Sequence, residues 1–214
     1  MAKYQHIIWD WNGTLLDDAW LCVEILNDIT RKYNKPSITF EQYRSEFDFP
    51  VKDYYRRIGF DFTIESFETV ANDYITEYNR RRFECNLNSD AANVLHLSSK
   101  AGLTQSILSA YQQTRLEEAV AHFKITDFFT KLFGLNDYYA AGKIENGKRL
   151  IEQLDCGANQ VLLIGDTTHD YEVAQSIGAD CVLLACGHQS KEKLLSCKTT
   201  ILDNLIQISD IINH

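Results

Sequence analysis

The amino-acid sequence predicts an α/β fold in which a doubly wound parallel sheet carries an inserted, all-helical segment. Four short runs of the chain are apolar or nearly so, without clear alternation: 6–9, 105–108, 161–164 and 181–185. Such runs are typical of strands that are buried on both faces. Between them, apolar residues recur at helical spacing, for example at Leu116, Ala119, Val120 and Phe123. Strands that alternate with helices favour a doubly wound α/β domain.

Residues 17–85 break this alternation and are expected to form helices only. Apolar residues recur there at intervals of three and four in two sets: Cys22, Ile25, Leu26, Ile29 and Tyr33, then Ile64, Phe67, Val70, Ala71, Tyr74 and Tyr78. The segment GFDFT, from Gly59, is expected to connect two helices and to end in a helix N-cap at Thr63. We therefore expect two domains, a core of residues 1–16 and 86–214 and a helical domain of residues 17–85.

Composition and charge exclude several classes of protein. The 214 residues carry a formal charge of −9, which would repel a polyanion, so we expect no nucleic-acid partner. No apolar run is long enough for a signal peptide or a membrane span. The six cysteines show no Cys-x-x-Cys spacing and are interpreted as reduced, mostly buried thiols. We expect a cytoplasmic protein without a membrane partner, either a monomer or a small homo-oligomer.

Polar residues follow three of the expected strands. Asp10 follows the first strand, Ser109 the second and Asp166 the third, with Asp170 one helical turn further on. Ligands of parallel α/β sheets gather beyond the carboxyl ends of the strands, so these side chains are expected at one edge if the three strands are neighbours. Crowded carboxylates repel one another unless a cation lies among them or they take up protons, and carboxylate oxygens together with substrate phosphate oxygens suit Mg²⁺. The pattern predicts a metal–phosphate site.

The motifs DWNGTLLDD, ILSA, a lysine in AGKIENGKRL, and GDTTHD together resemble the four motifs of phosphatases in the haloacid dehalogenase (HAD) superfamily. The helical insertion is similar to the cap of the phosphoglycolate-phosphatase-like branch. The resemblance covers nearly the whole chain and implies a Rossmann-like core. It also implies a hydrolase that uses Mg²⁺ to remove phosphate from a small phosphorylated metabolite.

The resemblance implies a role for each matching residue. Asp10 would attack phosphorus and form an aspartyl-phosphate. Ser109 would hydrogen-bond a phosphoryl oxygen, and Lys143 would neutralise the nucleophile and the transferring group. Asp10 and Asp166 would hold Mg²⁺, and Asp170 would bind the ion or orient its water.

Further positions complete the expected site. The backbone carbonyl of Asn12 would be another Mg²⁺ ligand, and Gly13, Thr14, Ala110 and Lys52 would lie at the substrate. Ala110 departs from the asparagine that often follows the serine in this superfamily.

The motif lysine has two candidates. The superfamily usually carries a proline after this lysine, but Ile144 follows Lys143. Lys148 is therefore the alternative. The distance from Lys143 to Gly165 favours Lys143.

Asn12 stands where these phosphatases generally carry an aspartate that protonates the leaving oxygen and later activates water. An amide can do neither, and such acid–base catalysis contributes about 10² to 10⁴ in rate. One interpretation is that Asn-Gly simply makes a good turn. A second is that Asp10 is phosphorylated readily only by activated donors and releases phosphate slowly. A third is that Asn12 deamidates to an acid with age.

Asn12 also opens an alternative class of function. The chain could be a catalytically weakened protein that binds phosphorylated ligands or carries a phosphoryl group. The other motif residues favour an enzyme, because a pure binding protein has no need of a nucleophile.

Some residues have simpler interpretations. His169 is expected to face solvent on the first turn of a helix. His188, in CGHQS, could reach the site, but a polar loop is the simpler interpretation. The run Arg80–82 is interpreted as favourable charge near a helix C-terminus.

Overall fold

A computed structural model describes residues 3–136 and 142–212 of the protein. Its core is a six-stranded sheet in the order β5-β4-β1-β6-β7-β8, and every pair of neighbours is parallel. The strands are β1 (His6–Trp9), β4 (Thr104–Gln112), β5 (Lys131–Leu135), β6 (Val161–Gly165), β7 (Asp180–Leu184) and β8 (Thr200–Leu202). The predicted doubly wound α/β fold is confirmed.

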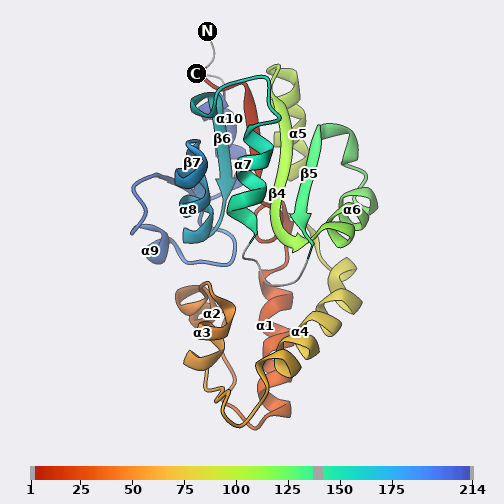
Figure 1. Ribbon diagram of the computed structural model, residues 1–214, viewed down its shortest axis with the longest axis vertical. Coiled ribbons are helices and arrows are strands. Elements are labelled where there is room, and N and C mark those ends of the chain that lie inside the picture. The colour runs from red at the N-terminus through yellow and green to blue at the C-terminus, as the bar shows by residue number, and fades with distance from the viewer. Residues whose placement is uncertain (1–2, 137–141, 213–214) are drawn as a thin grey trace.

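Helices cover both faces of the sheet, as Figure 1 shows. In β1 the side chains of Ile7 and Trp9 pack on one face, in the same core as α5, α6 and α10, while Ile8 packs on the other with α7 and α8. This division follows from the two-residue period of a strand. The core helices are α5 (Ala91–Lys100), α6 (Gln113–His122), α7 (Lys143–Ile151), α8 (Thr168–Ile177), α9 (Lys191–Leu194) and α10 (Ile208–Ile212).

The segment after β1 is helical, as expected, and we call residues 19–81 the helical lobe. Its helices are α1 (Ala19–Lys32), α2 (Phe40–Glu46), α3 (Val51–Arg57) and α4 (Phe67–Arg81). A short antiparallel pair, β2 (Leu16–Asp17) and β3 (Asn86–Leu87), joins the lobe to the core. The domain boundaries at residues 17 and 85 stay a prediction. Single-turn 3₁₀ helices complete the described chain: η1 (Arg82–Glu84), η2 (Thr126–Phe128), η3 (Ala158–Gln160) and η4 (Leu205–Gln207).

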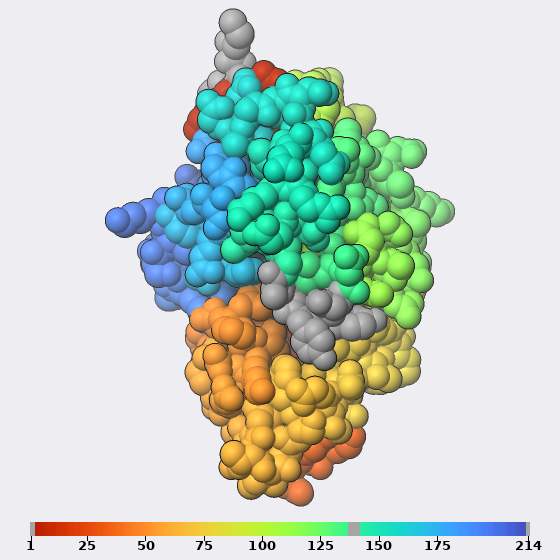
Figure 2. Space-filling view, viewed as in Figure 1, coloured from red at the N-terminus to blue at the C-terminus, as the bar shows by residue number. Residues whose placement is uncertain are grey.

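The lobe lies beyond the end of the sheet at which the first strand ends, and Figure 2 shows its orange part against the blue part of the core. Hydrogen bonds join the two there. The Gln189 side-chain amide donates to the Phe47 carbonyl (3.0 Å), and the Ser190 backbone N–H donates to the Arg44 carbonyl (2.9 Å). The lobe therefore covers the carboxyl ends of the strands, where the sequence predicts the site.

The structure corrects several details. The N-cap of α4 is Ser66 and not Thr63, because the Ser66 hydroxyl accepts the Thr69 backbone N–H whereas Thr63 bonds to Asp61. The edge strands β5 and β8 were not expected, since most of their residues are only half-buried and form no uniform apolar run. No helix among residues 3–136 and 142–212 has the length and apolar character that a membrane span needs.

Candidate active site

Asp10 lies directly after β1, where its backbone N–H donates to the Ile164 carbonyl of β6 (2.8 Å). This bond continues the sheet pairing one residue beyond the strand and fixes the carboxylate at the sheet edge. The residue is 6% exposed. Its Oδ1 accepts a hydrogen bond from Lys143 Nζ at 2.5 Å, whereas no described residue donates a hydrogen bond to Oδ2.

Lys143 lies between two carboxylates. It is the first residue of α7, and its buried Nζ contacts Asp10 Oδ1 at 2.5 Å and Asp170 Oδ1 at 2.6 Å. Burial alone would lower the pKa of this amine, but the two carboxylates outweigh burial and raise it. Lys148, the alternative motif lysine, pairs instead with Glu145 at the surface (2.8 Å). Lys143 is therefore the lysine beside Asp10.

Asp10, Asp166 and Asp170 form an acidic cluster, in which one carboxylate oxygen of each residue lies within 4.8 Å of the others. All three are buried. Burial raises the pKa of Asp10 to about 8, Lys143 opposes the rise, and the two neighbouring carboxylates add to it. Burial also raises the pKa of Asp166 to about 6. At neutral pH the carboxylates of Asp166 and Asp170 face one ammonium, so the cluster keeps an excess of negative charge, and loss of the Asp10 proton adds to it.

Both oxygens of Asp170 are already engaged. Oδ1 accepts from Lys143, and Oδ2 accepts from the Thr167 hydroxyl (2.6 Å) and backbone N–H (3.0 Å). Burial raises the pKa of Asp170, but Lys143 and Thr167 outweigh burial and hold it below its usual range. These contacts fix Lys143 beside Asp10, while the role of Asp170 as a metal ligand stays a prediction.

Asp166 is clamped by loops on two sides. Its Oδ1 accepts from the Thr14 hydroxyl (2.9 Å) and its Oδ2 from the His188 backbone N–H (2.6 Å). A Cβ on Gly13 would lie 2.3 Å from Asp166 Oδ2, and one on Gly187 would lie 2.2 Å from it. Thr14 and Gly13, expected at the substrate, thus contact Asp166 and are not among the described residues that line the cavity. Their sequence position beside Asp10 did not reveal this orientation.

The acidic cluster fits a hard divalent cation. Its donors are carboxylate oxygens, which Mg²⁺ and similar ions prefer, and its excess negative charge is of the kind that such an ion neutralises. The close packing of glycine against Asp166 leaves that carboxylate little freedom to turn away. The described residues can therefore hold a divalent metal.

The side chain of Asn12 points toward the lobe. Its Nδ2 donates to Asp18 Oδ2 (2.8 Å) and lies 2.7 Å from the Tyr78 hydroxyl, which itself donates to Asp18 (2.6 Å). The next residue, Gly13, has a φ of 73°, in the left-handed region that favours glycine. Gly13 thus has the backbone geometry that the turn interpretation expects, and the Asn12 amide also hydrogen-bonds a buried acid, while the choice among the three interpretations of Asn12 stays a prediction.

Asp18 and His188 are both buried beside Asn12, although no role was expected for Asp18 and a polar loop was the simpler interpretation for His188. His188 Nε2 lies 3.3 Å from Asp18 Oδ1, and the other ring nitrogen lies 2.8 Å from the Tyr43 hydroxyl. Burial lowers the pKa of His188, but the Asp18 carboxylate outweighs burial and raises it to about 9. The loop interpretation of 186–190 is correct for the backbone but missed the burial of His188. The second acid of LLDD was the available signal for Asp18.

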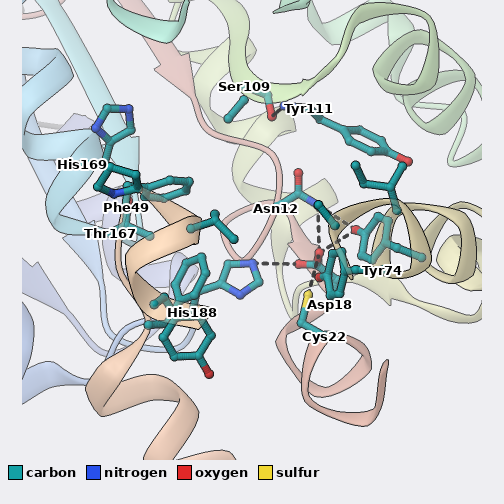
Figure 3. Close-up of a pocket in the computed structure, with 18 of the residues that line it drawn as sticks. Asn12, Asp18, Cys22, Phe49, Tyr74, Ser109, Tyr111, Thr167, His169 and His188 are labelled. Carbon is teal, nitrogen blue, oxygen red and sulfur yellow. Dashed lines mark hydrogen bonds and ion pairs between the residues drawn. The ribbon is translucent and has the colours of Figure 1, made fainter. Parts of the chain in front are cut away.

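A cavity of about 660 Å³ lies between the lobe and the acidic cluster. At the core end it is lined by Asp10, Asn12, Ser109, Ala110 and Lys143, and Figure 3 shows Ser109 above Asn12 in this space. The Ser109 hydroxyl oxygen accepts the Tyr111 backbone N–H (3.0 Å) where the pairing of β4 with β5 shifts register. Ser109 was expected at the end of its strand. It lies instead within β4, which continues to Gln112.

Lys52 and the arginines at 80–82, the other basic residues considered from the sequence, lie in different surroundings. Lys52 lines the cavity, with its Nζ 5.2 Å from the centre of the Phe67 ring. Each arginine of the 80–82 run pairs with a glutamate, and none of the three is among the described residues that line the cavity. His169 is also at the cavity, where its ring packs on that of Phe49 with centroids 5.1 Å apart, and the expectation that it faces solvent is wrong.

The fold has solved relatives of low sequence identity. A predicted phosphatase from Clostridium acetobutylicum matches with a TM-score of 0.80 at 19% identity, covering 98% of each chain. A predicted phosphoglycolate phosphatase from Haemophilus somnus matches with a TM-score of 0.72 at 17% identity, covering 99% of each. The structure of protein tyrosine kinase A (PtkA) from Mycobacterium tuberculosis matches with a TM-score of 0.82 at 20% identity, covering 99% of each.

Comparisons of sequence agree with this fold. Tyrosine-protein kinase PtkA of M. tuberculosis is 22% identical over 209 residues, which are 97% of this chain and 71% of PtkA. The model of the haloacid dehalogenase-like hydrolase family matches residues 7–184, from β1 to the end of β7. With Asp10, Lys143 and Asp166 gathered at one edge of the sheet, the chain belongs to the haloacid dehalogenase-like hydrolases.

Proposed function

We propose that this hydrolase is a Mg²⁺-dependent phosphatase that acts on a small phosphorylated metabolite through an aspartyl-phosphate on Asp10. The observation that carries the proposal is the Lys143 bridge: one buried ammonium holds Asp10 Oδ1 and Asp170 together at the floor of a cavity. A binding protein would gain nothing from orienting a carboxylate in this way.

The contacts of Asp10 suit nucleophilic attack. Lys143 fixes Oδ1, which leaves Oδ2 to form the bond to phosphorus while the bond to the leaving oxygen breaks. The Lys143 ammonium also offsets negative charge on the transferring phosphoryl group. Ser109, which lines the same floor, supplies a hydroxyl to a phosphoryl oxygen.

Asp10, Asp166 and the backbone carbonyl of Asn12 would hold the Mg²⁺ ion, with Asp170 beside them. A bound divalent ion supplies charge neutralisation between the carboxylates and the phosphate oxygens. Thr14 and the His188 backbone N–H keep Asp166 turned toward the cluster.

The step of the proposed phosphatase reaction that these residues support least is the hydrolysis of the aspartyl-phosphate by water. Asn12 cannot serve as a general base, and its amide nitrogen is tied to Asp18. This contact favours a second candidate, a protein that keeps its phosphoryl group or passes it to an acceptor other than water. The name of the relative PtkA, a tyrosine kinase, supports a transfer of that kind on this scaffold.

Rapid mixing of the protein with Mg²⁺ and acetyl phosphate tests both candidates. A phosphatase gives a phospho-Asp10 species that forms and decays to inorganic phosphate, and Asp10→Asn or EDTA abolishes both. A carrier gives a stoichiometric burst without further turnover. Absence of both phospho-Asp10 and phosphate release would refute the proposal. A panel of phosphorylated metabolites that includes phosphoglycolate then identifies the substrate.

A further inference from the structure

The cavity above Asp10 is large for the leaving group of a two-carbon phosphate. Its volume of about 660 Å³ lies within the range of roughly 300–1,000 Å³ that holds drug-sized ligands. A phosphate held by Asp10, Lys143 and Ser109 would occupy only the floor of the cavity. Most of the space therefore faces the group that carries the phosphate.

Aromatic side chains form two walls of this space. One wall comes from the α2–α3 connection, where Phe47 stacks on Tyr43 (centroids 5.0 Å apart) and Phe49 packs on His169. The other wall comes from α4 and β4. Figure 3 shows Phe49 and His169 on one side of Asn12, and Tyr74 and Tyr111 on the other.

The second wall is continuous from the lobe to the core. Tyr74 stacks on Tyr78 with centroids 6.0 Å apart, and Tyr78 packs on Tyr111 of the core at 5.8 Å. Aromatic rings prefer offset-stacked and edge-to-face partners at such distances. A flat ring placed between the two walls would find partners of this kind on both sides.

Charge in the cavity does not favour an anionic leaving group. Beyond the floor, Asp18 and Glu172 are acids that line the space, and Lys52 is the one lysine or arginine that the described part of the lobe contributes. The imidazole of His188 also lines the space, but its charge is paired with Asp18 at 3.3 Å. Lys52 lies over the rings of Phe62 and Phe67. A carboxylate such as that of phosphoglycolate has no buried arginine to bind here among the described residues.

Asn12 sets a chemical limit on the same group. When Asp10 Oδ2 bonds to phosphorus, the leaving oxygen takes the electron pair of the breaking bond, and the Asn12 amide has no proton to give it. An alkoxide is about as basic as hydroxide, whose conjugate acid has a pKa near 15.7. A phenolate, with a conjugate acid of pKa about 10, leaves as the anion far more readily.

We propose that this chain selects small aryl phosphates, with the aromatic ring seated between the Phe47–Phe49 wall and the Tyr74–Tyr78 wall and the phosphate on Asp10. The inference rests on the proposed function and names its substrate class. The attack forms the bond from Asp10 to phosphorus and releases the phenolate, which takes a proton from solvent. The cavity and Asn12 point to the same class independently, one by shape and one by chemistry.

Calorimetric titration with phosphonates tests the cavity without any turnover, because the carbon–phosphorus bond is not hydrolysed. In the presence of Mg²⁺, benzylphosphonate should bind at least tenfold more tightly than methylphosphonate. Phe49→Leu and Tyr74→Leu should each reduce this preference about 3- to 10-fold, the range of an aromatic pair. Phe83→Leu is the matched control, since Phe83 stacks on His122 outside the cavity and is 41% exposed.

Kinetics test the chemistry. The kcat/KM of substituted phenyl phosphates should fall steeply as the pKa of the phenol rises. It should exceed that of glycerol phosphate or phosphoglycolate by about 10² or more, the lower end of general acid catalysis. Asn12→Asp should narrow this ratio at least tenfold, because it restores an acid for the poorer leaving groups.

The two measurements separate the inference from the proposed function. Equal affinity for the two phosphonates, or a kcat/KM for phosphoglycolate that matches the phenyl phosphates, overturns the inference while phosphatase activity stands. Faster turnover of a phosphotyrosyl peptide than of free phenyl phosphates also overturns it, because recognition would then lie outside the cavity. Failure of every phosphate to label Asp10 overturns the proposed function, whatever the phosphonates show.

Discussion

Replacement of Lys143 by methionine should destabilise the protein severely, since methionine fills similar space without the charge. Lys143 Nζ lies 2.5 Å from Asp10 and 2.6 Å from Asp170, and the three side chains are at most 9% exposed. Removal of one partner from a buried ion pair costs about 3–5 kcal/mol, because the remaining charge stays buried without compensation. Here two carboxylates lose their partner at once.

Lys148→Met is the matched control for this variant. Lys148 belongs to the same helix and pairs with Glu145 at 2.8 Å, but the two side chains are 49% and 70% exposed. A surface pair of this kind contributes about 0–1 kcal/mol. The contrast between the two lysines therefore tests burial and not the mere presence of an ion pair.

Urea unfolding in the presence of EDTA, followed by circular dichroism, gives the free energy of unfolding of each variant. We expect a loss of about 3–5 kcal/mol for Lys143→Met and of less than about 1 kcal/mol for Lys148→Met. Mg²⁺ should restore part of the loss, because it neutralises the same carboxylates. Equal stabilities of the two variants would show that Lys143 is not a buried counter-ion.

Three more predictions concern other parts of the structure. Burial lowers the pKa of His6 to about 4. The contribution of the neutral ring to the free energy of unfolding is therefore complete above about pH 6.5 and is lost as the pH falls. Wild type should therefore lose about 2 kcal/mol more than His6→Gln between pH 7.5 and 5 in urea unfolding, and parallel profiles would contradict this. Gly187→Ala should weaken Mg²⁺ binding about tenfold or more in calorimetry, because the new Cβ would displace the Asp166 carboxylate. An affinity equal to that of the wild type would show that the close packing of Gly187 does not hold Asp166 in place. Tyr78→Phe removes a 2.6 Å hydrogen bond to buried Asp18 and should cost about 1–3 kcal/mol in urea unfolding, whereas an unchanged midpoint would mean that this bond is dispensable.

The fold was predictable wherever burial follows a local period. The runs at β1, β4, β6 and β7 are apolar because both faces of these strands are covered, and the lobe helices α1 and α4 keep an apolar stripe. The edge strands β5 and β8 were missed, since strands with half-buried residues carry no such signal. The N-cap of α4 was misplaced by three residues because several side chains of that segment can cap a helix.

The site residues also divide into those that the sequence predicted and those that it could not assign. The sequence by itself predicted Asp10, Ser109 and Asp166 at or near strand ends, and the pairing of β1 with both β4 and β6 brings residues at such positions to one edge. It left Lys143 and Lys148 as alternatives, and packing of α7 against the sheet decided between them by burying the first. The distance along the chain to Gly165 favoured Lys143, but both lysines lie on the same helix, so the helical pattern alone could not separate them.

Only the tertiary structure decided what surrounds Asn12. Its amide contacts Asp18 and Tyr78, and Asp18 in turn lies beside His188, from a loop more than a hundred and fifty residues away in the chain. These contacts exist because the lobe folds back onto the strand ends. Sequence periodicity records which face of an element is buried, but not which distant polar group it meets there. The residues at the strand ends were therefore predictable from the sequence, whereas the residues that the lobe places beside them were not.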